Sequence, residues 1–153
     1  MILAPGVAWR RLGVPSLEAL AGAGVFYGAA GSEARAMEGG DVFIVGAGNS
    51  AGQAAVHLAG HAASVTMLVR GGVLGATMSD YLIQKIEATP NISVRLRTEA
   101  VDGQGTGRLE QLTLRDHRSG TTQAVPAAAL FVMIGATPRT QWLRETITCD
   151  QQG

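Results

Sequence analysis

The sequence predicts an α/β fold in three layers, with a parallel sheet, covering helices and an inserted antiparallel β-meander. Two apolar, β-branched segments, residues 41–45 and 64–69, lie on either side of a stretch with helical spacing. Continuous apolar runs of this kind are typical of strands that are buried on both faces, as in parallel sheets. Alternating segments separated by turn residues occupy residues 99–125, which favours a small meander.

The expected elements follow one another as strand, helix, strand, helix, strand, meander and strand. Their ranges, in order, are 41–45, 51–62, 64–69, 77–88, a strand that contains Val94 and Leu96, 99–125 and 129–134. Both helices carry apolar residues at a spacing of three and four, which places those residues on one helical face. Pro90 ends the second helix, because proline lacks the N–H group that a helix interior needs.

The region before these elements is less regular. Residues 2–6 read as the end of a strand that runs into a turn, residues 13–24 as a loop with a short turn, and residues 32–37 as a short helix. Residues 2–6 also share a pattern with residues 133–138, since both are apolar segments that end in small residues and a proline. Paired exits of this kind suit strands that leave one domain for another.

Composition places the chain among globular proteins and excludes several classes of partner. Its 153 residues fit one domain, of which 46% are apolar and 16% are charged. Twelve basic and twelve acidic residues cancel, so neither nucleic acid nor an acidic membrane surface is an expected partner. No apolar run approaches the roughly 20 residues of a membrane span, and no secretory signal is visible, so we expect a cytoplasmic location.

The cysteine and histidine content limits redox and metal chemistry. Cys149 is the only cysteine and cannot form an internal disulfide, a dithiol redox pair or a four-cysteine zinc site. We interpret it as an incidental thiol near the end of the chain. His57 and His61 have a spacing that could bind zinc, but no third ligand accompanies them, and we expect both at exposed helical positions. No metal site is therefore predicted.

The turn after residues 41–45 carries the clearest functional pattern, G-x-G-x-x-A. Gly46 permits the tight turn, Gly48 lets the backbone approach a pyrophosphate, and Ala51 keeps the helix close to the strand. The free N–H groups of the first helical turn then face the anion, and Asn49 and Ser50 can donate further hydrogen bonds. With a strand before it and a helix after it, this motif predicts a Rossmann-like dinucleotide-binding domain.

The end of the second strand indicates which dinucleotide binds. NAD sites usually hold an acidic residue there for the ribose hydroxyls, whereas this sequence has Arg70, followed by Gly71. A guanidinium suits the 2′-phosphate of NADPH and a carboxylate would repel it, so NADPH is expected ahead of NADH. The alternative that Arg70 is a solvated strand-end charge stays open. The same arginine disfavours an S-adenosylmethionine-binding methyltransferase, which also needs an acidic ribose partner.

These residues resemble the NADPH-binding domain of the thioredoxin reductase-like pyridine nucleotide–disulfide oxidoreductases. The resemblance runs over nearly the whole chain and is carried by residues 24–27, 45–51, 68–70, the β-meander, and residues 130–135 with Pro138. It implies a homodimeric flavoprotein in which hydride passes from NADPH to FAD. It also implies that Gly135 lies near the nicotinamide end of the cofactor.

The resemblance divides the chain into three parts. Residues 1–24 would be a crossover strand and linker from an FAD domain, residues 25–138 the NAD(P)H-binding domain, and residues 139–153 a truncated return linker. The turn at residues 4–6 resembles the family's Ala-Thr-Gly turn, with Pro5 in place of threonine. Neither half of an FAD domain is present in the sequence. We therefore interpret the chain as a fragment or a truncated gene product whose partner in cis, the FAD domain, is missing.

Two departures from the family pattern bear on chemistry. The redox Cys-x-x-Cys of the disulfide-reducing members would fall within residues 27–34, which contain no cysteine. Thiol–disulfide exchange needs a thiolate, so dithiol chemistry is not expected. Those members also carry additional arginines after the position of Arg70, where this sequence has Gly71 and Gly75. A 2′-phosphate would be held less firmly, which weakens the preference for NADPH.

The expected function is therefore that of an NADPH-binding domain from an FAD-dependent, thioredoxin reductase-like oxidoreductase without a dithiol. Tyr81 and Lys85 match the catalytic spacing of short-chain dehydrogenases, but they lie too close to the glycine loop, and we interpret the match as coincidence. We predict no catalytic acid, base or nucleophile, and no turnover by the isolated chain. The alternative is a non-catalytic NAD(P)-binding or interaction module.

Overall fold

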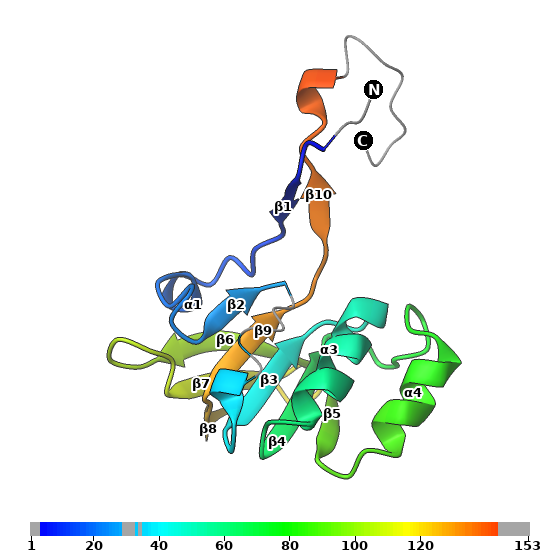
Figure 1. Cartoon of the computed structure of the whole chain (residues 1–153). Helices are drawn as coiled ribbons and strands as arrows, with labels where there is room; N and C mark the ends of the chain where they lie inside the picture. Colours follow the sequence, from blue (N-terminus) through cyan, green and yellow to red (C-terminus); the bar gives the residue numbers. More distant parts are fainter. Residues whose placement is uncertain (1–3, 29–32, 34, 144–153) are drawn as a thin grey trace.

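The computed structural model describes residues 4–28, 33 and 35–143 of the chain. A five-stranded sheet forms its centre (Figure 1). In spatial order the strands are β2 (Val25–Tyr27), β9 (Ala129–Val132), β3 (Asp41–Val45), β4 (Ser64–Val69) and β5 (Ile92–Leu96). All four pairings between neighbouring strands are parallel, as the continuous apolar runs predicted.

Helices cover one face of this sheet. They are α3 (Asn49–Ala59) and α4 (Asp80–Glu87). Successive side chains of a strand point to opposite faces, and Val42 and Ile44 of β3 face the helices and pack with Ala55 and Leu82. Val42, Ile44 and Ala55 are completely buried. The small alanine side chains of α3 allow the helix to lie close to the sheet, as predicted from its helical face.

The opposite face of the sheet packs against the β-meander, a separate three-stranded antiparallel sheet. Its strands are β6 (Thr98–Gln104), β7 (Gln111–Asp116) and β8 (Thr122–Pro126). Phe43 and Val45 alternate with the helix-facing residues of β3 and form a second core with Leu112 and Leu114 of β7. Figure 1 shows the helices on one side of the parallel sheet and the meander on the other. The three-layer α/β fold is therefore confirmed.

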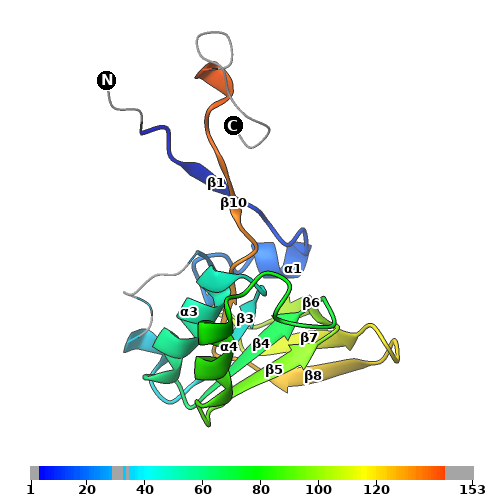
Figure 2. The same cartoon turned by 90° about the vertical axis from the view of Figure 1, so that its right-hand side faces the viewer.

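A two-stranded antiparallel ribbon extends away from the domain (Figures 1 and 2). It pairs β1 (Val7–Trp9) with β10 (Ala136–Pro138). Beyond the paired residues, the Arg10 N–H donates to the Gly135 carbonyl at 3.0 Å, which closes the ribbon at its domain end. The paired residues, 7–9 and 136–138, thus coincide only in part with the two segments of similar sequence, 2–6 and 133–138.

The strand end and turn predicted at residues 2–6 lie only partly within the described residues. Residues 1–3 lie outside the described residues, and residues 4–6 form no strand. Gly6 adopts a left-handed φ of +73°, which agrees with the predicted turn, and the first described strand, β1, begins after it at Val7. Strand β2 was not expected from the residues themselves, since three residues are too few to show a period.

The remaining long elements have the predicted type, with some different ends. Strands β3 and β4 match the predicted residues 41–45 and 64–69. Helix α3 begins and ends earlier than the predicted 51–62, and α4 is shorter than the predicted 77–88. Strand β9 ends at Val132, two residues before the end of the predicted strand 129–134. Periodicity does not report where a helix or strand ends, because ends are set by caps and by tertiary contacts.

Short helical turns account for the other differences. The loop predicted at residues 13–24 contains α1 (Pro15–Glu18). Within the predicted helix at residues 32–37, the structure describes residue 33 and a single 3₁₀ turn, η1 (Arg35–Met37). A second 3₁₀ turn, η2 (Gln141–Leu143), follows the ribbon. No helix in the described part of the chain is long and apolar enough to cross a membrane.

A polar cluster fastens α1 and the loop before it to the sheet. Tyr27, at the end of β2, donates a hydrogen bond from its hydroxyl to the carboxylate of Glu18. Arg11 pairs with the same carboxylate at 2.5 Å, and its guanidinium lies 5.2 Å from the centre of the Tyr27 ring. Burial raises the pKa of Glu18, but hydrogen bonds from Tyr27 and Arg11 together outweigh it and hold that pKa below its ordinary value. The ionised carboxylate is therefore the stabilising form.

Glu18→Gln should lower the free energy of unfolding at neutral pH, because an amide replaces the carboxylate that accepts from Tyr27 and Arg11. A group whose folded-state pKa is lowered stabilises the fold above its ordinary pKa, and this contribution is lost as the pH falls through the folded-state value. The stability difference between wild type and Glu18→Gln should therefore shrink below about pH 4. Urea unfolding followed by circular dichroism at a series of pH values measures it. The exposed Glu110→Gln is the control, and the same pH dependence in both variants would contradict the assignment.

Candidate functional site

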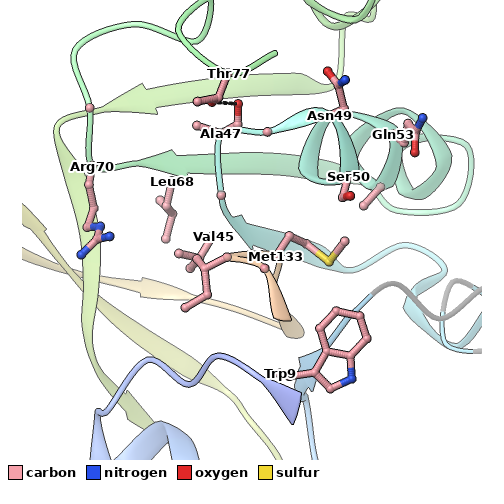
Figure 3. Close-up of a pocket in the computed structure, with 16 residues that line it drawn as sticks. Trp9, Val45, Ala47, Asn49, Ser50, Gln53, Leu68, Arg70, Thr77 and Met133 are labelled. Carbon is pink, nitrogen blue, oxygen red and sulfur yellow. Dashed lines mark hydrogen bonds between the residues drawn. The ribbon is translucent and has the colours of Figure 1, made fainter. Parts of the chain in front are cut away.

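The glycine loop after β3 opens onto a cavity of about 790 Å³ at the carboxyl ends of the parallel strands (Figure 3). This is the edge at which open α/β sheets bind ligands. Seven of the eight predicted cofactor-binding residues line the cavity, namely Gly46, Gly48, Asn49, Ser50, Arg70, Gly71 and Gly135. The eighth, Ala51, is completely buried. That these residues bind a cofactor stays a prediction.

Gly46 allows three backbone segments to approach one another closely. Its φ is +149°, and a Cβ atom there would lie 2.5 Å from the Met133 carbonyl oxygen and 3.0 Å from the Cβ of Ala51. The approach is held by the Met133 N–H, which donates to the Val45 carbonyl at 2.8 Å. Ala51 stands where a larger side chain would force α3 away from β3. Gly46 and Ala51 thus shape the loop from the protein side.

Gly48 differs, because the protein leaves the space beside it open. A Cβ atom at this position would have its nearest neighbour, the Thr77 carbonyl oxygen, at 4.0 Å. Its backbone angles, φ −90° and ψ 177°, lie in the extended region that any residue adopts. No described neighbour of Gly48 therefore requires a glycine. The room left by the missing Cβ is available to a molecule in the cavity.

The start of α3 is suited to an anion. Gly48 caps the helix without a side-chain hydrogen bond, and the first turn contains no acidic residue. The first N–H groups of a helix have no acceptor within the helix, and the helix dipole adds positive potential at this end. Ser50 is exposed at the cavity wall, so its hydroxyl is a further donor.

Side-chain hydrogen bonds fix the glycine loop to the segment before α4. The Asn49 side-chain oxygen accepts from the Ser79 N–H at 2.8 Å. The Thr77 hydroxyl donates to the Ala47 carbonyl at 2.9 Å, a bond drawn in Figure 3. Asn49 was predicted only as a donor to a ligand. The structure shows that its oxygen has a structural role, which leaves the amide nitrogen for other acceptors.

Arg70 is the first residue beyond β4 and lies at one end of the cavity, with Trp9 at the other end (Figure 3). Its side chain is exposed and makes no hydrogen bond or ion pair with any of the described residues. The cavity therefore has a helix N-terminus along one wall and an unpaired cation at one end.

The comparison with protein families decides where this arrangement belongs. Residues 1–153 match the family described as pyridine nucleotide-disulphide oxidoreductase. The chain belongs to this family. Membership implies pyridine nucleotide and flavin cofactors.

Relatives within the family match the chain over its full length. Thioredoxin reductase of Streptomyces clavuligerus is 32% identical, NADH dehydrogenase of Bacillus subtilis 31%, and thioredoxin reductase of Streptomyces coelicolor 31%, each over 153 residues. The chain covers 47%, 30% and 47% of these three proteins, respectively. It therefore spans less than half the length of the relatives named here.

Solved structures agree with the fold. Thioredoxin reductase from Streptococcus pyogenes superposes with a TM-score of 0.88 at 23% identity, and thioredoxin reductase from Giardia duodenalis with 0.85 at 23%. Each superposition covers 97% of this chain and 48% of the other. The Rossmann-like fold that the glycine motif predicted is thereby confirmed.

Within residues 27–34, where the family's dithiol would fall, Gly28 has no room for a side chain. Its φ is +87°, and a Cβ atom there would lie 2.8 Å from Cζ2 of Trp9 and 3.1 Å from two further atoms of that indole. Trp9 belongs to the ribbon and also lines the cavity, so one side chain covers Gly28 and forms part of the site. Residues 29–32 and 34 lie outside the described residues.

Sequence reasoning missed several residues that line the cavity, among them Trp9, Gln53, Thr77 and Met133. Gln53 lies one helical turn after Asn49, and this spacing could have indicated it. Trp9 lines the cavity from β1 of the ribbon, and Met133 lines it from the segment that follows β9. No local pattern in the sequence reports such long-range contacts.

The remaining motifs lie away from this cavity. Tyr81 is 67% exposed, with the Lys85 ammonium 5.8 Å from the centre of its ring, and neither lines the cavity. His57 and His61 are not buried, although His61 follows α3 rather than lying on it. Among the described residues, no group of three His, Cys, Asp or Glu side chains could hold a metal ion. Cys149 lies outside the described residues.

Gly46→Ala and Gly48→Ala should differ sharply in their effects on stability. Gly46→Ala should cost roughly 2–4 kcal/mol, because the new Cβ overlaps the Met133 carbonyl and alanine disfavours the positive φ. Gly48→Ala should change stability by less than about 0.5 kcal/mol, because its Cβ enters open space. Urea unfolding of both variants measures the difference. A loss in Gly48→Ala as large as in Gly46→Ala would contradict the distinction between the two glycines.

Proposed function

We propose that this chain is the NADPH-binding domain of an FAD-dependent, thioredoxin reductase-like oxidoreductase. The observation that carries the proposal is one cavity that combines three features. These are a helix N-terminus without a side-chain cap, a glycine beside which the fold leaves open space, and an arginine with no hydrogen bond or ion pair to the described residues. In the whole protein, NADPH held in this cavity would supply a hydride to a flavin.

The glycine loop would hold the pyrophosphate. The N–H groups at the start of α3 would donate to phosphate oxygens, and the missing Cβ of Gly48 would allow them to approach closely. Ser50 would add a hydroxyl donor. Because Asn49 is bonded to Ser79, these donors are fixed before binding, which reduces the entropy lost on binding.

Arg70 favours NADPH over NADH. A guanidinium donates to phosphate oxygens in a planar, charge-assisted geometry, and the 2′-phosphate would supply the anion that Arg70 lacks. Among the described residues that line the cavity, none is acidic, so a carboxylate for the ribose hydroxyls of NADH is not provided there. NADH is the alternative, since a relative named NADH dehydrogenase is 31% identical.

The nicotinamide would lie at the opposite end, beside Gly135 and Trp9. No atom lies within 4 Å of the position of a Cβ on Gly135, so its surface is open to the cavity. The ribbon supports the proposed division into a crossover at residues 1–24, a nucleotide-binding domain at 25–138 and a return linker at 139–153. Paired strands leaving one edge would join this domain to an FAD domain in cis. A homodimer in the cytoplasm is part of the same proposal.

The proposed enzyme would pass electrons from the flavin without a dithiol. Residues 27–34 contain no cysteine, and Trp9 fills the space beside Gly28 in which a side chain would lie. An exposed thiolate is needed to attack a disulfide. Electrons would therefore pass from the flavin to their acceptor without a dithiol in this segment.

Arg70→Ala should weaken NADPH binding about tenfold or more and leave NADH binding within about twofold, because only NADPH carries the 2′-phosphate. Trp9 provides the signal, since nucleotide bound beside it should quench its fluorescence. A Trp142→Phe background removes the only other tryptophan. The exposed Arg108→Ala, which makes the same charge change, is the control. Equal losses for both nucleotides would reject the role of Arg70.

The purified chain should show no NADPH-dependent reduction of a disulfide dye, with or without added FAD. The reason is that the segment matching the family's dithiol has no sulfur. The dye assay follows absorbance of the released thiolate, with a dithiol-containing thioredoxin reductase as positive control. Turnover that persists in Cys149→Ser would contradict the absence of dithiol chemistry.

A further inference from the structure

Arg97 does not line the cavity itself but has an unusual backbone conformation next to Gly71, which does. It lies between β5 and β6 with a φ of +53°, and it is the only non-glycine residue with a positive φ in the described part of the chain. Two backbone hydrogen bonds impose this conformation. The Arg97 N–H donates to the Gly71 carbonyl at 3.0 Å, and its own carbonyl accepts from the His117 N–H at 2.8 Å. Left-handed backbone at a non-glycine residue costs about 1 kcal/mol or more, so these contacts hold Arg97 in place against strain.

The Arg97 side chain passes over Gly72. A Cβ atom on Gly72 would lie 3.1 Å from a terminal guanidinium nitrogen of Arg97, 3.5 Å from its Cζ and 3.6 Å from its Nε. Because Gly72 has no side chain, the guanidinium can lie close to the loop that follows β4. Gly72 therefore leaves room for the positive charge of Arg97 beside this loop.

The guanidinium of Arg97 has no anionic partner among the described residues. Glu99, two residues further along the chain, is already paired with Arg115 at 3.0 Å and with His117 at 3.4 Å. Arg97 is exposed, so its charge is open to a ligand in solution.

Arg70 and Arg97 leave neighbouring strands at the same level. In the parallel pairing of β4 with β5, the last register pair is Val69 with Leu96, and the two arginines follow these residues directly. Neighbouring strands lie about 4.8 Å apart, so both cations start from one short stretch of the sheet edge. The bond from Arg97 to the Gly71 carbonyl holds the two strand ends together.

We propose that Arg97 is a second specificity residue for a ribose 2′-phosphate, acting together with Arg70. This rests on the proposed function. A phosphomonoester carries close to two negative charges at neutral pH, which one arginine cannot neutralise. Gly71 and Gly75 stand where related disulfide-reducing enzymes are expected to have further arginines. Arg97 supplies the missing charge from the adjacent strand instead.

Arg97→Gly is the variant of choice, because glycine accepts the positive φ and removes the guanidinium without adding strain. The experiment titrates four ligands: NADPH, NADH, adenosine 2′,5′-bisphosphate and AMP. Quenching of Trp9 fluorescence in the Trp142→Phe background reports binding of the two dinucleotides. Calorimetry reports binding of the two mononucleotides. Arg97→Gly should weaken NADPH and adenosine 2′,5′-bisphosphate binding about five- to tenfold, and NADH and AMP binding less than about twofold. Arg108→Ala should change none of the four.

Arg97→Lys provides a second readout, since it keeps the charge but loses the planar fork, and it should recover part of the lost affinity for NADPH. Unchanged NADPH binding in Arg97→Gly, or equal losses for NADPH and NADH, would overturn the role of Arg97. If Arg70→Ala still weakens NADPH binding more than NADH binding in that case, the proposed NADPH site stands and only the inference about Arg97 fails. If the wild-type chain binds none of the four ligands, the proposed function fails and this inference with it.

Discussion

The close contact between the end of β3 and the segment after β9 is the constraint on which the rest of the site depends. The Met133 carbonyl lies so near Gly46 that no side chain fits between them. The chain must therefore turn sharply at Gly46, and the turn directs the start of α3 toward the carboxyl edge of the sheet. This contact therefore helps to place the start of α3 beside the cavity.

Charge is distributed unevenly around this edge. Two acidic residues near the meander already have partners. Glu99 interacts with Arg115 and His117, and Glu18 interacts with Arg11 and Tyr27. The basic side chains at the ends of β4 and β5 are left unpaired among the described residues. Since the net charge of the chain is zero, this is a local arrangement and not a general attraction to anions.

Much of the fold could be predicted from the sequence because its signals are local. Strands 41–45 and 64–69 are buried on both faces and therefore largely apolar, and the glycine motif depends on a few adjacent residues. Strand β1 could not be predicted, because it has only three residues and is defined by its long-range pairing with β10. The same holds for the site. Gly46 was visible as part of a motif, whereas Trp9 lines the cavity through a tertiary contact in which its indole covers Gly28.

If the ribbon joins this domain to an FAD domain, as proposed, the position of Trp9 has a consequence for communication between the two. Trp9 is part of the ribbon and also part of the cavity wall, so a molecule in the cavity and the orientation of the ribbon both depend on one side chain. Thermodynamic linkage is reciprocal. If the occupant favours one orientation of the ribbon, that orientation must raise the affinity for the occupant by the same factor.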